Sequence, residues 1–303
     1  MELRTLRYFL ALAQEGTISN AAKALHVTQP TLSRQLADLE KGFGKRLFER
    51  GSKRIVLTDD GMRLREYAES IVELADKAEA ELAQSTQSVS GDVYIGCGES
   101  DAMRLVLRAA HEVRQRYPGV HFHLFSGTSA DLADRFDGGL FDFMVEFELV
   151  GRPDCRALTL PAVDTWGVLM RTDHPLASRE TVRVEDLAEL PLICSRQGVK
   201  SGKMREWAGA SFDDWDVVAT YNLVLNGALM VEEGLGVAVT YDRLVRIADD
   251  DALCFRPLDP PLASEIGLIW KKHRRLSKAA AAFLESMRDV CENERTNVSR
   301  ETS

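Results

Sequence analysis

The side chains best suited to molecular recognition are the hydroxyl, amide and guanidinium groups at residues 28–34. Leu32, Leu36 and Leu39 repeat there at the spacing of one buried helix face, which leaves the polar groups on the opposite face. A threonine at the start is the natural N-cap, and a proline fits the first turn, where a missing N–H costs nothing. Such a helix start can place hydrogen-bond donors against the edges of DNA bases. The candidate residues are Thr28, Gln29, Pro30, Thr31, Ser33 and Arg34.

A shorter amphipathic segment precedes this helix. Ile18, Ala21, Ala22 and Leu25 share one face, and the break between the two segments falls at 26–27. The alanines are small enough for the two helices to cross closely, as a helix-turn-helix requires. Two helices joined by a short turn also occur as an ordinary buried hairpin, so the pair alone does not establish DNA binding.

A β-wing is predicted after the helix pair. Residues 47–50 and 55–57 resemble strands, and the turn between them is rich in glycine and cations. Residues 1–58 contain ten Lys and Arg against five Asp and Glu, although the whole chain has a net charge of −9. This asymmetry is expected when one domain alone contacts nucleic acid. The wing cations that we expect along the phosphate backbone or minor groove are Arg50, Lys53 and Arg54.

Several runs of sequence carry a family resemblance. AAKALHVTQPTLSRQLADLE (21–40), GKRLFER (44–50) and VLTDDG (56–61) closely resemble the winged helix-turn-helix of LysR-type transcriptional regulators. Two later segments, 171–193 and 231–240, resemble the effector-binding half of that family, and the similarity continues to about residue 290. The resemblance implies an α+β protein overall, with a winged helix-turn-helix, a long linker helix and a two-lobed α/β effector domain similar to periplasmic binding proteins.

We therefore predict three parts in the chain. They are a DNA-binding N-terminal module (1–58), a coiled-coil dimerisation helix (59–88) and an effector-binding domain (91–303). Within the last part, lobe I covers about 91–160 and 269–292, lobe II covers about 161–268, and residues 293–303 form a disordered tail.

The linker helix carries apolar residues at alternating steps of four and three. This spacing is typical of a coiled-coil seam, although a single amphipathic helix packed on its own domain has a similar pattern. A homodimer, or a dimer of dimers, would place two recognition helices on two half-sites of operator DNA. The predicted seam is Leu64, Ala68, Ile71, Ala75, Ala78 and Leu82.

From residue 92 onward, strand-like and helix-like segments alternate, which indicates mostly parallel sheets. Ligands bind such sheets beyond the carboxyl ends of the strands, against helix N-termini. The polar loops at 97–101, 126–129 and 195–202 occupy such positions, although serine and glycine there are usually only helix caps. The candidate effector-binding residues are Glu99, Ser100, Thr128, Ser129, Glu146, Ser201 and Gly202.

The charge of this candidate site depends on three carboxylates. Glu99, Glu146 and Glu148 either face the cleft between the lobes or lie solvated on its rim. If they face it, a simple carboxylate effector is disfavoured unless cations of the other lobe compensate, and an amine-bearing or amphoteric effector is favoured. The candidate cations are Arg196, Lys200 and Lys203.

Other classes of protein fit less well. The chain lacks GxSxG, HExxH, Walker and GxGxxG motifs, and its six histidines form no metal-binding pattern, so no catalytic residue, metal or cofactor is expected. Its five cysteines are scattered, which makes sensing through a cysteine pair a minor alternative. A solute-binding protein needs a signal peptide, but charged residues interrupt the apolar N-terminal segment. We predict a cytoplasmic transcription regulator whose binding to double-stranded operator DNA is modulated by a small effector, without membrane association.

Overall fold

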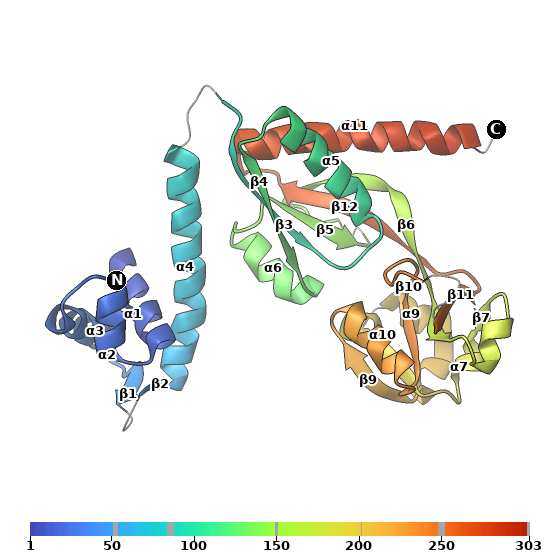
Figure 1. Cartoon of the computed structure of the whole chain (residues 1–303), viewed down its shortest axis with the longest axis horizontal. Coiled ribbons are helices and arrows are strands. Elements are labelled where there is room, and N and C mark those ends of the chain that lie inside the picture. The colour runs from blue at the N-terminus through green and yellow to red at the C-terminus, as the bar shows by residue number, and fades with distance from the viewer. Residues whose placement is uncertain (51–53, 84–87, 149–150, 201, 248–251, 302–303) are drawn as a thin grey trace. The chain divides into compact units, whose positions relative to one another are not determined.

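The structure, a computed structural model, describes residues 1–50, 54–83, 88–148, 151–200, 202–247 and 252–301 of the chain (Figure 1). The chain divides into two compact units. One contains the N-terminal module and the helix that follows it, and the other contains nearly all residues from 88 onward, which we name the C-terminal domain. The predicted positions Lys53 and Ser201 lie outside the described residues, as does the side chain of Arg50.

The described residues of the N-terminal module form the predicted helix-turn-helix and an antiparallel wing (Figure 1). The wing strands pair Phe48 with Leu57 and Arg50 with Ile55. The elements of this unit are α1 (Leu3–Glu15), α2 (Ile18–Ala24), α3 (Gln29–Phe43), β1 (Phe48–Arg50), β2 (Ile55–Leu57) and α4 (Asp59–Ala83).

Threonine caps determine where three of these helices begin. The Thr17 hydroxyl accepts a hydrogen bond from the third residue of α2, at 3.2 Å. Thr28 does the same for Thr31 at 3.4 Å, and Thr58 for Gly61 at 3.1 Å. Each cap satisfies an N–H that has no partner within its own helix. All three helix starts therefore follow from residues that are local in the sequence.

One apolar core joins α1, α2 and α3 to α4. Ala68 of α4 is fully buried in this core, and Leu64 packs against it. An ion pair between Arg7 and Asp76 also ties α1 to α4. The largest fully buried side chains of the module are Leu6, Phe9, Leu12, Leu32 and Leu36.

This packing divides the predicted dimerisation seam between two faces of α4. Leu64 and Ala68 face their own module. The sequence did not reveal this, because an amphipathic helix and a coiled-coil seam share nearly the same apolar spacing. Ile71 and Leu82, in contrast, are 40% and 86% exposed. The remaining seam positions are the half-buried Ala75 and the exposed Ala78. Tyr67 and Leu74, outside the predicted seam, are exposed as well.

Lobe I of the C-terminal domain is built on three parallel strands, with β3 between β4 and β5. Its apolar core fills the space between this sheet and the helices α5 and α11. These elements are β3 (Gly91–Cys97), α5 (Met103–Arg116), β4 (Val120–Ser126), α6 (Ser129–Asp137), β5 (Phe143–Phe147) and α11 (Lys278–Glu301).

Lobe II has its own sheet, in which β8 pairs in parallel with both β9 and β10, and two apolar clusters lie around it. Its strands are β7 (Val182–Arg183), β8 (Leu192–Ser195), β9 (Val217–Tyr221), β10 (Val237–Tyr241) and β11 (Leu253–Asp259). Its helices are α7 (Val184–Leu187), α8 (Arg196–Lys200), α9 (Gly202–Ala208) and α10 (Val224–Glu232), with short 3₁₀ turns η1 (Pro175–Ser178) and η2 (Gly209–Asp214).

The long strand β6 (Cys155–Arg171) runs from lobe I into lobe II, and β12 (Ala263–Lys271) begins where the chain returns to lobe I; both run antiparallel to their neighbours. β6 pairs with β12 as far as Thr165 and with β10 from Trp166 onward. The crossing therefore lies between these two residues and just before Ala263, whereas the sequence placed it near 160 and 268. No turn residue marks the change of lobe, because β6 continues unbroken through it.

The C-terminal segment differs from the prediction. Residues 293–301 continue α11, although their polar composition predicts a disordered tail. Two contacts hold this part of the helix to lobe I. Arg108 of α5 pairs with Glu294 at 2.8 Å, and Arg295 donates to the carbonyl oxygen of Thr159 at 3.1 Å. Such tertiary contacts outweigh weak local propensity.

Candidate functional site

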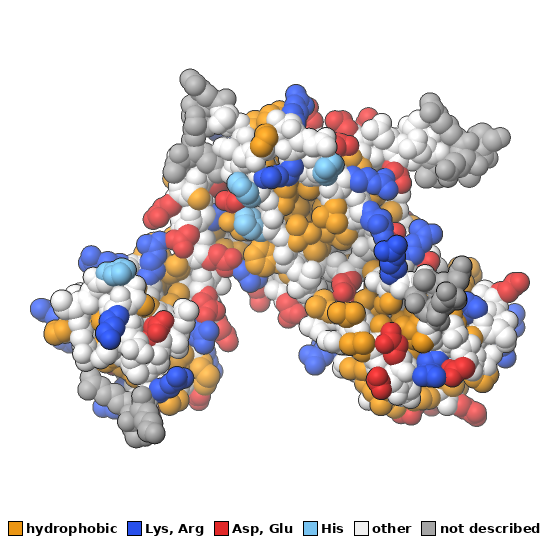
Figure 2. Space-filling model, in the orientation of Figure 1, with side chains coloured by type: hydrophobic (Ala, Val, Ile, Leu, Met, Phe, Trp, Pro, Cys, Tyr) orange, Lys and Arg blue, Asp and Glu red, His pale blue; other side chains and the backbone are white. Residues whose placement is uncertain are grey.

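The N-cap and first two turns of α3 present the predicted base-reading residues together. Thr28, Gln29, Pro30, Thr31 and Arg34 are exposed, and Ser33 is half-buried. The Thr28 and Thr31 hydroxyls lie 2.8 Å apart, and Ser19 of α2 donates to the Gln29 side chain at 3.2 Å. Lys and Arg side chains are spread over the visible face of the N-terminal module (Figure 2). The arrangement suits a helix whose N-terminal turn enters the major groove.

The base of the wing is fixed to the end of α1. The N–H of Ile55 donates to the carbonyl oxygen of Gly16 at 2.8 Å. Gly16 has φ of 71°, a left-handed conformation that glycine adopts without strain, and the exposed Arg54 lies beside it. The guanidinium of Arg54 is thus carried next to the helix-turn-helix, where a phosphate contact is possible.

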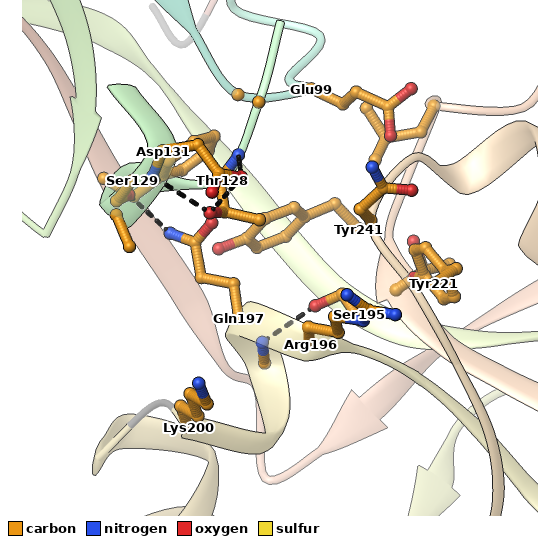
Figure 3. Close-up of a pocket in the computed structure, with 18 of the residues that line it drawn as sticks. Glu99, Thr128, Ser129, Asp131, Ser195, Arg196, Gln197, Lys200, Tyr221 and Tyr241 are labelled. Carbon is orange, nitrogen blue, oxygen red and sulfur yellow. Dashed lines mark hydrogen bonds between the residues drawn. The ribbon is translucent and has the colours of Figure 1, made fainter. Parts of the chain in front are cut away.

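A cavity of about 500 Å³ lies between lobes I and II (Figure 3). Its lobe I wall comes from the loops after β3, β4 and β5, and its lobe II wall comes from β6 and the loops after β8, β9 and β10. The polar lobe I residues are Glu99, Thr128, Ser129, Asp131 and Glu148. The polar or charged lobe II residues include Ser195, Arg196, Gln197, Lys200, Tyr221, Asn222, Thr240 and Tyr241. This is the position at strand ends that the sequence predicts.

Three aromatic rings form an apolar wall of the cavity, which we name the aromatic wall: Phe147, Trp166 and Tyr241. The rings of Phe147 and Tyr241 stack with centroids 5.6 Å apart, and those of Trp166 and Tyr241 lie 4.2 Å apart. The Tyr241 hydroxyl and the Trp166 indole N–H point to the Ser264 Oγ, at 3.1 and 3.3 Å. A flat apolar group can pack against such a wall.

Two hydrogen bonds join the lobes at the cavity. Gln197 Nε2 donates to Ser129 Oγ at 2.7 Å, which Figure 3 shows as a dashed line. The backbone N–H of Val224, at the start of α10, donates to Glu99 Oε2 at 2.5 Å. Burial raises the pKa of Glu99, and the bond from Val224 partly offsets this. Ion pairs between Lys203 and Glu148 and between Arg243 and Asp101 also join the lobes.

Thr128 acts as the cap of α6. Its hydroxyl donates to Asp131 Oδ2 at 2.7 Å and accepts from the N–H of Asp131 at 3.3 Å. The N–H of Thr128 also donates to the same carboxylate, at 3.3 Å. Thr128 lines the cavity as predicted, but its polar groups already have partners, so a structural role accounts for them.

The charges at the cavity come from both lobes. Glu99, Asp131 and Glu148 belong to lobe I, and the exposed Arg196 and Lys200 belong to lobe II. Within the described part of the chain, neither cation forms an ion pair or a hydrogen bond. The third candidate cation contacts the rim: Lys203 Nζ lies 4.0 Å from Glu148 Oε1, which also accepts from the Ser264 hydroxyl at 3.4 Å.

Three predicted effector residues do not line the cavity. Ser100 is buried, and its hydroxyl accepts from the N–H of Ala102 at 3.0 Å. Glu146 pairs with Arg152 at 3.3 Å, on the opposite face of β5 from Phe147, because neighbouring strand residues point to opposite faces. Gly202 is exposed at the start of α9, away from the cavity lining.

A buried carboxyl lies close to the point where β6 changes lobes. Asp164 is 3% exposed, and its Oδ2 has no hydrogen-bond partner among the described residues. Burial raises the pKa of Asp164 to about 6; a bond from the Ser100 hydroxyl opposes this shift, and the nearby Asp101 and Asp242 add to it. This side chain is therefore a titratable group in the crossing region.

The cysteines show no reactive environment. Cys97, Cys155, Cys194 and Cys291 are buried, and Cys254 is partly buried. Burial raises the pKa of all five thiols, that of Cys194 to about 12. A protonated buried thiol is a poor nucleophile, which weighs against redox sensing.

Sequence reasoning missed most of the lobe II side of the cavity. It located the loop after β8 but did not apply the same strand-end rule to β9, β10 and β6. Tyr221 and Tyr241 are the last residues of β9 and β10, so that rule identifies them once the strands are known. Trp166 lies inside β6, and no local signal marks it.

Two family models match this chain. A model described as "Bacterial regulatory helix-turn-helix protein, lysR family" matches residues 3–62, and "LysR substrate binding domain" matches residues 86–292. The chain belongs to the LysR family. It is thus a DNA-binding transcription regulator with an effector-binding domain, and that family consists of regulators rather than enzymes.

Individual relatives agree with this assignment to the LysR family. The SDS degradation transcriptional activation protein of Pseudomonas sp. (strain ATCC 19151) is 29% identical, covering 93% of this chain and 94% of its own. The transcriptional regulator BsdA of Bacillus subtilis (strain 168) is 26% identical, covering 94% and 99%. CbnR, solved in complex with its target DNA, shares the fold with a TM-score of 0.73 at 19% identity, covering 96% of this chain and 100% of that one.

Two further findings concern the described residues. Each helix in the described ranges is too short or too polar to cross a membrane. Within the same ranges, no group of three or more His, Cys, Asp or Glu side chains is placed to hold a metal ion.

Proposed function

We propose that this LysR-family regulator binds a twofold-symmetric operator through α3 and the wing, and that a small effector in the cleft controls this binding. The observation that carries the proposal is the polar face at the start of α3, where Thr28 fixes the start of the helix and Gln29, Ser33 and Arg34 occupy its first two turns. Side chains on such a turn reach base edges, and Arg54 at the base of the wing contacts a phosphate. Because its proposed target is operator DNA, the protein acts in the cytoplasm.

The protein acts as a homodimer, or as a dimer of dimers, through the outer face of α4. Tyr67, Ile71, Leu74 and Ala78 are exposed at steps of four, three and four, the spacing of a coiled-coil seam. Leu82, at 86% exposure, lies one helical turn further on. Leu64 and Ala68 are excluded from this seam because they pack on their own module. A parallel pair of α4 helices brings two recognition helices to one operator.

The direct test compares base-reading and phosphate-contacting variants. Arg34→Ala should lose about 1–3 kcal/mol of affinity for the operator and relax base preference, because a lost base contact is specific. Arg54→Ala should weaken binding to operator and random DNA alike and reduce the slope of affinity against salt by about one unit. Gel-shift titrations on both DNAs at several salt concentrations measure these effects. Equal losses on operator and random DNA for both variants would contradict the assignment.

The effector is an amine-bearing or amphoteric small molecule with a flat apolar part. The apolar part packs against the aromatic wall, and a cationic group lies near the carboxylates of Glu148 and Asp131. Arg196 and Lys200 at the opposite side accommodate an additional anionic group. Thermal-shift measurements with aromatic amines, amino acids and dicarboxylates test this class. Stabilisation by plain dicarboxylates alone would exclude it.

A ligand that prefers one arrangement of the lobes shifts the protein toward that arrangement. The strand β6 belongs to both lobes, because it pairs with β12 in lobe I and with β10 in lobe II, so a change at the cleft alters contacts in both sheets of the C-terminal domain. Effector binding and operator binding are then coupled, and each alters the affinity for the other by the same factor. Measuring operator affinity with and without effector gives that factor.

A further inference from the structure

The N-terminus of α10 lacks a cap from its own segment. Leu223 holds the N-cap position in an extended conformation, and its apolar side chain forms no capping hydrogen bond. The first N–H groups of a helix need an acceptor, and the helix dipole favours a negative charge there. This end of α10 therefore has the properties of an anion-binding position.

That position is filled by a carboxylate from the opposite lobe. Glu99 lies 125 residues earlier in the chain, and its Oε2 accepts the N–H of Val224 at 2.5 Å. Glu99 is half-buried, and the hydrogen bond from the N–H of Val224 opposes the rise in its pKa that burial causes. The carboxylate extends away from Thr128 and Ser129 in the cleft (Figure 3). The helix end is thus its main source of stabilisation.

We propose that Glu99 is a tethered anion that occupies the anion-binding end of α10 and thereby excludes effector carboxylates from that end of the cleft. The proposal rests on the function stated above and deepens it, because it names a residue that sets the charge of the effector. An effector carboxylate can bind α10 only by displacing Glu99, and two carboxylates at one helix end repel each other. A neutral or cationic group at this end of the ligand has no such competitor.

Removing the tethered carboxylate should open this position to a free one. In Glu99→Ala, acetate at about 100 mM should raise the melting temperature by about 2–4 °C over chloride at the same ionic strength. In the wild-type protein the same comparison should show no difference, because Glu99 already fills the position. All four tryptophans lie in the C-terminal domain, so the tryptophan fluorescence of the full chain reports the melting of that domain alone.

Two variants serve as controls. Ser129→Ala removes the other hydrogen bond that joins the lobes at the cavity but creates no free anion position, so acetate should have no specific effect on it. Glu99→Gln keeps an acceptor near Val224 without the charge, so acetate should not bind it either. The Val224 amide should exchange with solvent faster in Glu99→Gln than in wild type, because a neutral acceptor makes a weaker bond. This exchange measurement tests the proposal even if Glu99→Ala does not fold.

The outcomes separate the proposal from the wider function. Equal acetate stabilisation of wild type and Glu99→Ala overturns the proposal, as does a folded Glu99→Ala without an acetate response. Unchanged Val224 exchange in Glu99→Gln also overturns it. None of these results involves DNA, so they leave the operator-binding function standing. Failure of the wild-type protein to prefer an operator over random DNA contradicts that function instead.

Discussion

The starts of α3 and α10 both lie at surfaces where we propose that a ligand binds, but they are stabilised in different ways. α3 is capped by Thr28, three residues before the N–H that it accepts, whereas α10 is capped by Glu99 from the opposite lobe. The residues that we propose to read DNA bases thus lie within one short stretch of sequence. The cleft, in contrast, is assembled from segments between Gly98 and Leu244.

This difference has a physical consequence for mutations. A change on the outer face of α3 alters one surface without disturbing the packing beneath it. A change in the cleft alters contacts that also hold the two lobes together, so stability and ligand response should change together. Three experiments examine this contrast, beginning with the largest expected effect.

The first experiment asks whether one N-terminal module is sufficient for binding. Ile71→Asp introduces a charge into the outer face of α4, and two such charges repel in a parallel dimer. Operator affinity should fall by about 10²–10⁴-fold, because the second half-site no longer contributes. Sedimentation and gel-shift titration measure mass and affinity.

The control for this variant is Ala80→Asp, an exposed position nine residues further along α4, on the side opposite to Ile71. It should retain the mass and affinity of the wild type. A wild-type mass and operator affinity for Ile71→Asp would show that the outer face of α4 is not the dimer interface. The N-terminal module would then be as self-contained in function as it is in structure.

The second experiment titrates the crossing region. Asp164 has its pKa raised to about 6, so the folded state holds its proton more tightly than the unfolded state does. The stability of the C-terminal domain should therefore fall as the pH rises from about 4 to 6, by at most about 3 kcal/mol. Asp164→Asn should remove this decrease and stabilise the domain above pH 6.

Urea unfolding followed by tryptophan fluorescence, at several pH values from about 4.5 to 8, measures this effect. Asp214→Asn is the matched control, because that side chain is exposed and the variant should keep the wild-type pH profile. If Asp164→Asn and wild type lose stability equally between these pH values, the buried carboxyl is not the titrating group.

The third experiment compares two threonine caps. Thr28→Ala and Thr128→Val each remove a capping hydroxyl, so each should cost about 1 kcal/mol in the stability of its own unit. Only Thr28→Ala should weaken operator binding in the absence of effector. Only Thr128→Val should lower the melting temperature reported by tryptophan fluorescence. Loss of effector response by Thr128→Val without loss of stability would restore Thr128 as a ligand contact.

Features whose interacting residues lie close together in the sequence were predictable from the sequence alone. The caps of α2, α3 and α4 are set by Thr17, Thr28 and Thr58, each within three residues of its partner. The same local pattern revealed the leucine face of α3 and the two wing strands. The lobe I loops at 97–101 and 126–129 were also predictable, because each follows a segment that the sequence predicts to be a strand.

The rest of the cleft depends on which strands become neighbours. Glu99 was a candidate from its loop, but its bond to Val224 joins residues that only the folded lobes bring together. The aromatic wall combines β5, β6 and β10, whose adjacency follows from the sheet order and not from any one of them. The prediction that Leu64 and Ala68 belong to the dimer seam was wrong for a related reason. An apolar helix pattern does not show which partner its apolar face packs against, and here the partner is the N-terminal module of the same chain.

The position of β12 in the sheet also bears on how the protein is made. This strand lies between β5 and β6 in lobe I, yet it is synthesised after all of lobe II. A nascent chain that ends before Ala263 has every strand of lobe II but lacks both β12 and the helix α11 that covers lobe I. Because domains fold as units during synthesis, we expect lobe II to fold on the ribosome first and lobe I last. Until then the edges of β5 and β6 are open, and the emerging chain is exposed to wrong pairing with other strands.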